Sequence, residues 1–414
     1  MTNTFFQVLT LNIFAIGVVS CSGQIDLSEE TSALNLLFDV KTICEVVPQK
    51  YAYYESRAPH WPETCERAEK EASSLDGTKG SLAILERMID DLYDPHISLN
   101  THNQYSPRLV PTGSDMWVER IEGNYIVSAV RRSSGAANAG IRVGDKLVSF
   151  NELTPSALAL TRIHSGENNV TEERMTWAIN AAIAGKRVAL RNIKVLRGDN
   201  ILSFTMDSPE VPQLNEPILY KNLSENLGYI RFNNSLGNSN SVLAFNTALN
   251  ALRQTDGLII DLRETPSGGN TGVAEPILGR FIEKITAYQR TVLLNGSAKD
   301  RKIKPSGSWT YDKPVIVLVG RWTGSMGEGM AVGFDGMQRG KVMGSQMAGL
   351  AGGTEPIKLK ETGVSFNFPT YDLHHLNGTP RHDWTPSELI TADNGNDADI
   401  LMRSAILTLQ KKPR

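Results

Sequence analysis

Cysteine is scarce in this 414-residue chain, and its three positions, Cys21, Cys44 and Cys65, all lie in the first sixth of the sequence. No C-x-x-C pair or histidine-rich spacing accompanies them, so the usual pattern of zinc ligands is missing. We therefore expect neither a metal nor a cofactor.

An excess of charge of one sign is also missing. Lys and Arg number 42 and Asp and Glu number 45, which gives a formal net charge of −3, and there is no long Lys/Arg block. Proteins that bind nucleic acid usually carry a basic patch or stripe. The charge pattern therefore excludes an obvious nucleic-acid partner, while 40% hydrophobic residues indicate a globular protein.

The apolar run at residues 5–19 is too short and too polar for a membrane span, because Gln7, Thr10 and Asn12 interrupt it. Small residues follow it, which favours a signal peptide over residues 1–21, although no Lys or Arg precedes the run. We expect an exported protein that acts in the periplasm or at the outer membrane.

Val18-Val19-Ser20-Cys21 resembles a bacterial lipobox, which implies cleavage at Cys21 and lipid attachment to it. The alternative is a plain cleavage site that contains a cysteine. If Cys21 carries lipid, Cys44 and Cys65 remain as a pair that could form a disulfide in an oxidising compartment. Two buried free thiols are the alternative.

Residues 26–100 have a helical pattern, with apolar residues at three- and four-residue steps. Pro59 and Pro62 interrupt this pattern. A second helix is predicted over residues 78–92, and it ends before Asp94-Pro95-His96 because proline disfavours helix at the residue before it.

Residues 105–208 are predicted to form a compact β-rich domain. Gly140-Ile141-Arg142-Val143-Gly144-Asp145, between two predicted strands, resembles the turn of PDZ domains of bacterial proteases. The resemblance implies a module that binds a peptide as an added strand, with Gly140, Ile141 and Gly144 at the binding region. The alternative is a rigid spacer.

Residues 213–414 alternate strands with helices, which predicts an α/β core. Residues 257–263 and 314–320 are near-continuous apolar runs, typical of strands buried on both faces. Helices are predicted over residues 239–254 and 271–285.

The second of these buried strands leads into Trp322-Thr323-Gly324-Ser325-Met326-Gly327-Glu328. Glycines on either side of a serine allow a sharp turn from which the hydroxyl projects, at a helix N-terminus that favours negative charge. This arrangement suits a nucleophile, although many such turns only cap a helix.

The strand over residues 257–263 leads into Pro266-Ser267-Gly268-Gly269. Glycines allow the backbone to approach closely, so a free N–H of Gly268 or Gly269 could stabilise an oxyanion. A phosphate-binding turn and a plain turn are the alternatives.

Taken in order, these motifs resemble peptidase family S41, the tail-specific or C-terminal-processing peptidases and their tricorn-like relatives. The motifs are Tyr229-Ile230-Arg231-Phe232, Asp261-Leu262-Arg263 with Gly268-Gly269, Thr323-Gly324-Ser325-Met326-Gly327-Glu328 and Val342-Met343-Gly344. The resemblance implies a crotonase/ClpP-like α/β catalytic core with an inserted PDZ-like β-rich domain and an N-terminal helical segment. It also implies Ser325 as nucleophile and an oxyanion hole of the Met326 N–H with that of Gly268 or Gly269.

The general base departs from one branch of that family. Processing peptidases use a lysine in the stretch that corresponds to residues 345–352, where this chain has no lysine and the matching position is about Leu350. The tricorn-like branch uses a histidine before the PDZ domain, which implies His96. That branch also has a supporting carboxylate, whose position here falls at about His382, with Asp383 adjacent.

The sequence therefore predicts a serine peptidase that acts on peptide or protein substrates, with Ser325 as nucleophile and His96 as base. A catalytically inactive PDZ-containing binding protein and an esterase that uses the same serine are the alternatives. The oligomeric state is left open.

Overall fold

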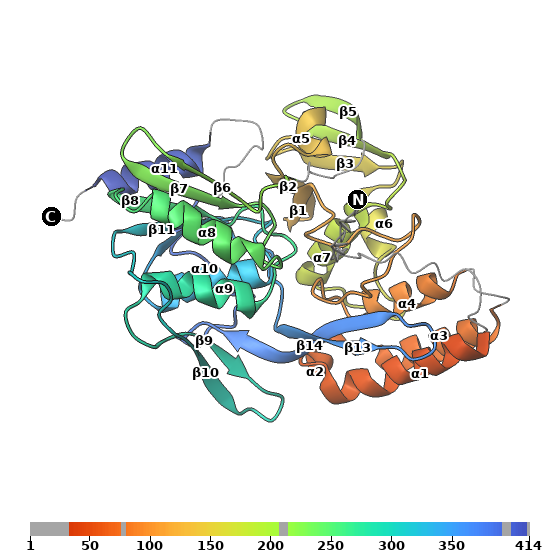
Figure 1. Cartoon of the computed structure of the whole chain (residues 1–414). Coiled ribbons are helices and arrows are strands. Elements are labelled where there is room, and N and C mark those ends of the chain that lie inside the picture. The colour runs from red at the N-terminus through yellow and green to blue at the C-terminus, as the bar shows by residue number, and fades with distance from the viewer. Residues whose placement is uncertain (1–32, 76–79, 207–213, 391–398, 412–414) are drawn as a thin grey trace, which may run out of the picture.

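A computed structural model describes residues 33–75, 80–206, 214–390 and 399–411. The predicted signal peptide and the predicted lipidation site Cys21 lie outside these residues. Figure 1 shows a mixed α/β fold with several sheets, in which a helical part and a β-rich part lie beside a larger core.

A six-stranded sheet forms the centre of the core. Its strand order is β15 (Glu388–Leu389), β12 (Lys341–Gly344), β11 (Val315–Val319), β8 (Gly257–Asp261), β7 (Leu227–Phe232) and β6 (Ile218–Asn222). Neighbouring strands are parallel, except that β6 runs antiparallel to β7. Every residue of β8 and β11 is buried, which explains why both read as continuous apolar runs.

Helices cover both faces of this sheet. One face carries α8 (Asn240–Ala251), α9 (Thr271–Leu278) and α10 (Met326–Gly336), and the other carries α11 (Ile400–Gln410). Side chains alternate along a strand, so Leu258 and Ile260 pack with the first set of helices, whereas Ile259 packs with α11.

The N-terminal helices are α1 (Ala33–Lys50), α2 (Tyr54–Arg57), α3 (Trp61–Ser73) and α4 (Ser81–Asp90). Their apolar faces pack against Phe366 and Phe368 of β14 (Ser365–His374), which pairs with β13 (Gly353–Lys358). Ser98 and Asn367 exchange two backbone hydrogen bonds, of 3.0 and 2.8 Å. A hairpin from the C-terminal half therefore completes the core of the N-terminal segment (Figure 1).

The same strand β14 continues into a second sheet of the core. It pairs with β9 (Thr286–Val292), and β9 pairs with β10 (Ala298–Ile303), which gives the strand order β10-β9-β14-β13. This sheet connects the core to the helical part.

The β-rich part is a five-stranded antiparallel sheet in sequence order. It consists of β1 (Met116–Ile121), β2 (Asn124–Val130), β3 (Lys146–Phe150), β4 (Arg191–Arg197) and β5 (Asn200–Met206), with helices α5 (Gly135–Ala139), α6 (Pro155–Leu160) and α7 (Glu172–Ala184). Strand β1 is an edge of this sheet, and α7 packs beside it.

Two local predictions need correction. The helix predicted over residues 271–285 ends at Leu278 and continues as a short 3-10 helix, Gly279–Phe281, because the chain turns there to enter β9. Gly279 allows this turn, since a Cβ atom there would lie 2.4 Å from the carbonyl oxygen of Lys304. Pro62 does not interrupt a helix but lies in the first turn of α3, where its missing N–H costs no hydrogen bond.

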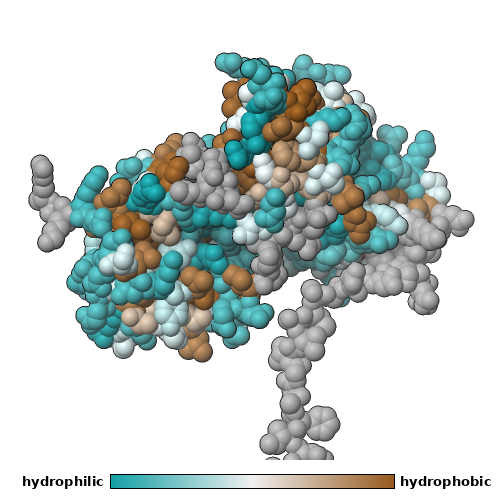
Figure 2. Space-filling model, turned by 90° about the horizontal axis from the view of Figure 1, so that it is seen from above, coloured by the Kyte–Doolittle hydropathy of each residue, from teal (hydrophilic) through white to brown (hydrophobic). Residues whose placement is uncertain are grey.

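Polar and apolar side chains are interspersed on the molecular surface. Figure 2 shows brown apolar residues scattered among teal polar ones on the face seen from above. Among the described residues, no helix is both long and apolar enough to cross a membrane.

Cys44 of α1 and Cys65 of α3 form a disulfide bond that closes a loop of 21 residues. The bond connects two helices that already contact each other through apolar side chains. A crosslink of this kind stabilises a protein by restricting its unfolded state.

We predict that replacing both cysteines by alanine lowers the free energy of unfolding by about 3 kcal/mol, the value expected for a loop of this length. Denaturant titration of the double variant and of the oxidised wild-type protein would measure the difference. Wild-type protein under a reducing agent is the matched control and should unfold like the variant. Equal midpoints for variant and oxidised wild type would contradict the prediction.

Candidate active site

Ser325 stands at a sharp turn between β11 and α10. Its backbone angles are φ 49° and ψ −109°, which is a strained conformation for a residue with a side chain. The Ser325 N–H donates to Glu328 Oε2 at 2.7 Å, which fixes the turn at the helix start. A strained turn of this kind also carries the nucleophile in α/β-hydrolases.

The turn after β8 lies directly against Ser325. Gly268 has φ +63°, and a Cβ atom on it would lie 2.4 Å from Ser325 Cβ. The neighbouring Gly269 is equally constrained, because a Cβ there would lie 2.1 Å from the backbone of Leu236. Only glycine fits at these two positions, which explains the Gly-Gly pair in the sequence.

Two backbone N–H groups at this contact are available to a ligand. The Gly268 N–H donates to the carbonyl of Thr265 at 3.0 Å. Within the described part of the chain, the N–H groups of Gly269 and Met326 have no hydrogen-bond partner. Met326 begins α10, where helix geometry leaves the first N–H groups unpaired. Of the two glycines predicted to supply a donor, Gly269 is therefore the one whose N–H is free.

His96 lies within hydrogen-bonding distance of the serine. Its Nε2 atom is 3.0 Å from Ser325 Oγ, and its Nδ1 atom is 2.7 Å from the carbonyl oxygen of Ala351. A carbonyl oxygen only accepts hydrogen bonds, so a neutral imidazole carries its proton on Nδ1. The lone pair of Nε2 then faces the serine hydroxyl, as a general base requires.

The turn that carries His96 is anchored to the N-terminal helices. The His96 N–H donates to Asp94 Oδ1 at 2.9 Å. Asp94 is buried, accepts a hydrogen bond from the Tyr51 hydroxyl at 2.7 Å and lies 3.1 Å from Arg57 Nη1. The helical part thereby fixes the position of the imidazole.

Two buried charges hold the loop that presents the Ala351 carbonyl. Arg381 Nη2 donates to the carbonyls of Leu350 and Gly352, at 2.9 and 2.8 Å, on either side of Ala351. Glu328 Oε1 accepts from the N–H groups of Gly349 and Leu350, at 2.8 and 3.2 Å. The same carboxylate therefore fixes both the serine turn and the loop that orients the histidine.

Burial and charge shift two pKa values in this network. Burial and the nearby Arg381 guanidinium lower the pKa of His96 to about 4. Burial raises the pKa of Glu328 to about 7, although Arg381 and three backbone N–H groups favour its carboxylate. The imidazole is therefore neutral, and able to accept a proton, over the whole neutral range.

The other residues predicted for the network lie apart from it. Neither His382 nor Asp383 forms a hydrogen bond with His96 or Ser325 in the described structure. His382 Nδ1 is 3.9 Å from Asp372, its Nε2 is 3.8 Å from Asp383, and the Asp383 side chain is largely exposed. Leu350, at the position of the lysine in processing peptidases, lies beside Gly324.

The three residues predicted for peptide binding form the turn after α5. Gly140 and Gly144 have φ of +94° and +90°, and Ile141 is buried in the core of the β-rich part. The edge of β1, where an added strand would pair, is already occupied at Val118, whose N–H and carbonyl bond the side chain of Asn180 at 2.9 and 2.7 Å.

Among the described residues, no group of three or more His, Cys, Asp or Glu side chains could hold a metal ion. His374 and His375 contact separate carboxylates, Asp372 at 2.7 Å and Asp335 at 3.1 Å.

Sequence reasoning missed Ala351 and Arg381. Every residue has a backbone carbonyl, so the residue type at position 351 could not indicate that this carbonyl contacts His96. Arg381 lies immediately before His382, in the stretch where a supporting carboxylate was sought. A buried arginine there contacts the loop that carries Ala351, which only the folded chain reveals.

We predict that Gly268→Ala abolishes the reaction of Ser325 with a serine-directed fluorophosphonate, because the new Cβ atom would displace the serine. Labelling of the purified variant would test this, with its thermal unfolding as a check on folding. Gly237→Ala is the matched control, since a Cβ there meets its nearest atom, in Gly269, only at 4.0 Å. Normal labelling of Gly268→Ala would contradict the prediction.

Comparison with known proteins identifies the fold. The structure is similar to the photosystem II D1 C-terminal processing protease, with 17% identity, a TM-score of 0.54, and coverage of 87% of this chain and 94% of that one. It is also similar to mature CPAF, with 15% identity, a TM-score of 0.58, and coverage of 92% and 96%. No curated protein matches the chain in sequence.

At these identities the similarity establishes the fold alone. A family model matches the sequence itself over residues 226–386, a range that contains the Gly268-Gly269 turn, Ser325 and Arg381. The matching model is that of peptidase family S41.

Proposed function

We propose that this protein is a serine peptidase in which Ser325 is the nucleophile and His96 the general base. The observation that carries the proposal is the distance of 3.0 Å between His96 Nε2 and Ser325 Oγ. The two residues lie 229 positions apart in the chain, and His96 Nδ1 is held by the Ala351 carbonyl in the tautomer that a base requires.

In the proposed reaction, His96 Nε2 accepts the Ser325 proton while Oγ attacks the carbonyl carbon of a peptide bond. The N–H groups of Met326 and Gly269 stabilise the resulting oxyanion. The tetrahedral intermediate then collapses, and the imidazolium returns the proton to the departing amine. A water molecule, deprotonated by His96, then attacks the acyl-enzyme. As the ester bond breaks, the imidazolium returns this proton to Ser325 Oγ and the second product leaves.

A neutral carbonyl replaces the usual carboxylate behind the histidine in this mechanism. The Ala351 oxygen orients the ring but stabilises an imidazolium less than a carboxylate would. The positive charge of Arg381 disfavours the imidazolium further. The proposed base is therefore weak. The strained serine turn and the oxyanion donors accordingly contribute a larger share of the rate enhancement than the base does.

Three further assignments belong to the proposal. Residues 213–414 form the crotonase/ClpP-like catalytic core, residues 105–208 the PDZ-like domain and residues 26–100 the N-terminal helical domain. The sheet order of each part supports this division, although β13–β14 of the core also covers the N-terminal helices. The signal peptide predicted over residues 1–21 supports peptide or protein substrates in the cell envelope.

We predict that Ser325→Ala lowers kcat/KM for hydrolysis of a casein-type protein substrate at least a thousandfold, and that His96→Gln lowers it at least about a hundredfold. Both variants should fold, and a fluorophosphonate should label only proteins that retain the serine. His102→Gln is the control, because this exposed histidine lies outside the site. No hydrolysis by wild type above a protein-free blank, with no labelling of its serine, would favour the inactive binding protein.

We also predict a shift in pH dependence when the charge of Arg381 is removed. His96 must be neutral to act as a base, so activity should fall as the pH drops through its pKa of about 4. Arg381→Gln removes a charge that lowers this pKa, so the acid limb of kcat/KM should move to higher pH. The measurement is the pH profile of kcat/KM.

Arg381→Lys separates charge from loop geometry. Lysine retains the positive charge but cannot reach both carbonyls in the same way, so the rate should fall while the acid limb stays near the wild-type position. A loss of rate in Arg381→Gln without movement of the acid limb would show that the arginine acts only through the loop.

A further inference from the structure

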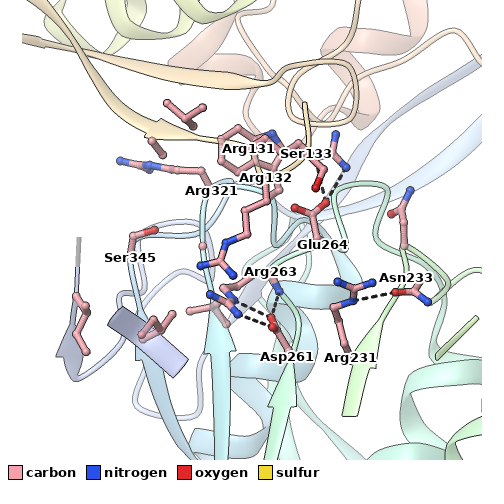
Figure 3. A pocket seen from close by; sticks show the side chains of 18 of the residues that line it. Arg131, Arg132, Ser133, Arg231, Asn233, Asp261, Arg263, Glu264, Arg321 and Ser345 are labelled. Atoms are coloured by element: carbon pink, nitrogen blue, oxygen red, sulfur yellow. Dashed lines mark hydrogen bonds and ion pairs between the residues drawn. The ribbon is translucent and has the colours of Figure 1, made fainter. Parts of the chain in front are cut away.

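A cavity lies between the core and the β-rich part, apart from the serine. It has a volume of about 360 Å³ and opens at the carboxyl ends of β7, β8 and β11, beneath the turn that follows β2 (Figure 3). Its size falls at the lower end of the range for small-molecule sites, about 300–1,000 Å³.

The cavity is distinct from the proposed catalytic site. Neither Ser325 nor His96 lines it. Tyr229 and Leu401 on its wall belong to the apolar cluster on the α11 face of the sheet, whereas Met326 packs with the helices on the opposite face. Trp322 and Glu264, which also line it, lie on the two turns that lead to the serine and to Gly268.

Arginine dominates the polar part of the lining, with five side chains at positions 131, 132, 231, 263 and 321. Four of the five are paired with carboxylates, namely Arg131 with Glu264, Arg132 with Asp399, Arg263 with Asp261 and Asp399, and Arg321 with Glu119. These pairs neutralise one another and fix the shape of the wall.

Arg231 differs from the other four. Its Nε atom donates to the side-chain oxygen of Asn233 at 3.0 Å, and within the described residues no carboxylate lies within ion-pair distance of it. Figure 3 shows the guanidinium of Arg231 beside the amide of Asn233. The two acids on the lining already have arginine partners, since Glu264 is bonded to Arg131 at 3.0 Å and Asp261 to Arg263. Arg231 therefore retains Nη donors, and a charge without a direct ion pair, for a ligand.

Apart from the charged residues and Asn233, the wall is mostly apolar, and Ser133, Asn234 and Ser345 are its polar members. Val130, Leu214, Tyr229, Trp322, Ile390 and Leu401 contribute side chains to it. A ligand that suits this cavity has one negative charge at one end, for Arg231, and an aliphatic body for the wall.

We propose that this cavity binds an aliphatic monocarboxylate, with the carboxylate on Arg231 and the hydrocarbon against Trp322 and Leu401. The bidentate geometry of arginine suits a carboxylate, and Asn233 holds the guanidinium in position from its Nε side. Two sources share this chemistry, a free fatty acid and the C-terminal residue of a peptide that ends in an apolar side chain.

Isothermal titration calorimetry on the full-length Ser325→Ala protein tests the proposal without any need for turnover, so it can fail independently of the proposed peptidase activity. The probes are octanoate and N-acetyl-leucine, each compared with its neutral amide. We expect at least one acid to bind, and its amide to bind about tenfold more weakly or not at all. Tighter binding of octanoate indicates a fatty acid, and tighter binding of N-acetyl-leucine indicates a peptide terminus.

Arg231→Gln should weaken binding of the preferred acid about tenfold or more, whereas Arg231→Lys should retain part of it. Arg290→Gln is the matched control, because this arginine pairs with Asp300 on the β9–β10 hairpin and does not line the cavity. Thermal unfolding checks that each variant folds. The proposal is overturned if neither acid binds at millimolar concentration, or if Arg231→Gln binds the acid as tightly as the parent protein.

Discussion

The site depends on the backbone of residues 349–352, which the buried side chains of Glu328 and Arg381 hold from either side. Glu328 accepts the N–H groups at the start of this loop, and Arg381 donates to the carbonyls around Ala351. Each charge is costly to bury alone, and each is satisfied by backbone dipoles. The resulting rigid loop positions the one carbonyl that contacts His96.

This constraint explains how the fold brings its functional groups together. Ser325 and the glycine turn lie at the carboxyl ends of adjacent parallel strands, β11 and β8, so their proximity follows from sheet topology. His96 instead arrives from the N-terminal part, where Asp94, Tyr51 and Arg57 hold its turn. The carbonyl oxygen of Ala351 accepts the hydrogen bond from His96 Nδ1 at the point where the N-terminal part meets the core.

Local signals in the sequence predicted much of this architecture. Strands β8 and β11 were predicted because buried parallel strands are continuous apolar runs, and the glycine turns because glycine allows close backbone approach. The end of α9 was missed, since it depends on contact with Lys304, a residue remote in sequence. Residue type likewise could not indicate the role of Ala351, the unpaired charge of Arg231, or the packing of β14 on α1–α4.

The pairing of Ser98 with Asn367 has a consequence for the order in which the parts of the protein can fold during synthesis. During synthesis the segment that carries His96 emerges first, but its hydrophobic face stays uncovered until Phe366 and Phe368 have been made. The histidine and the serine can therefore be aligned only when nearly the whole chain has left the ribosome. A nascent or truncated chain that lacks β14 therefore lacks the contact between His96 and Ser325.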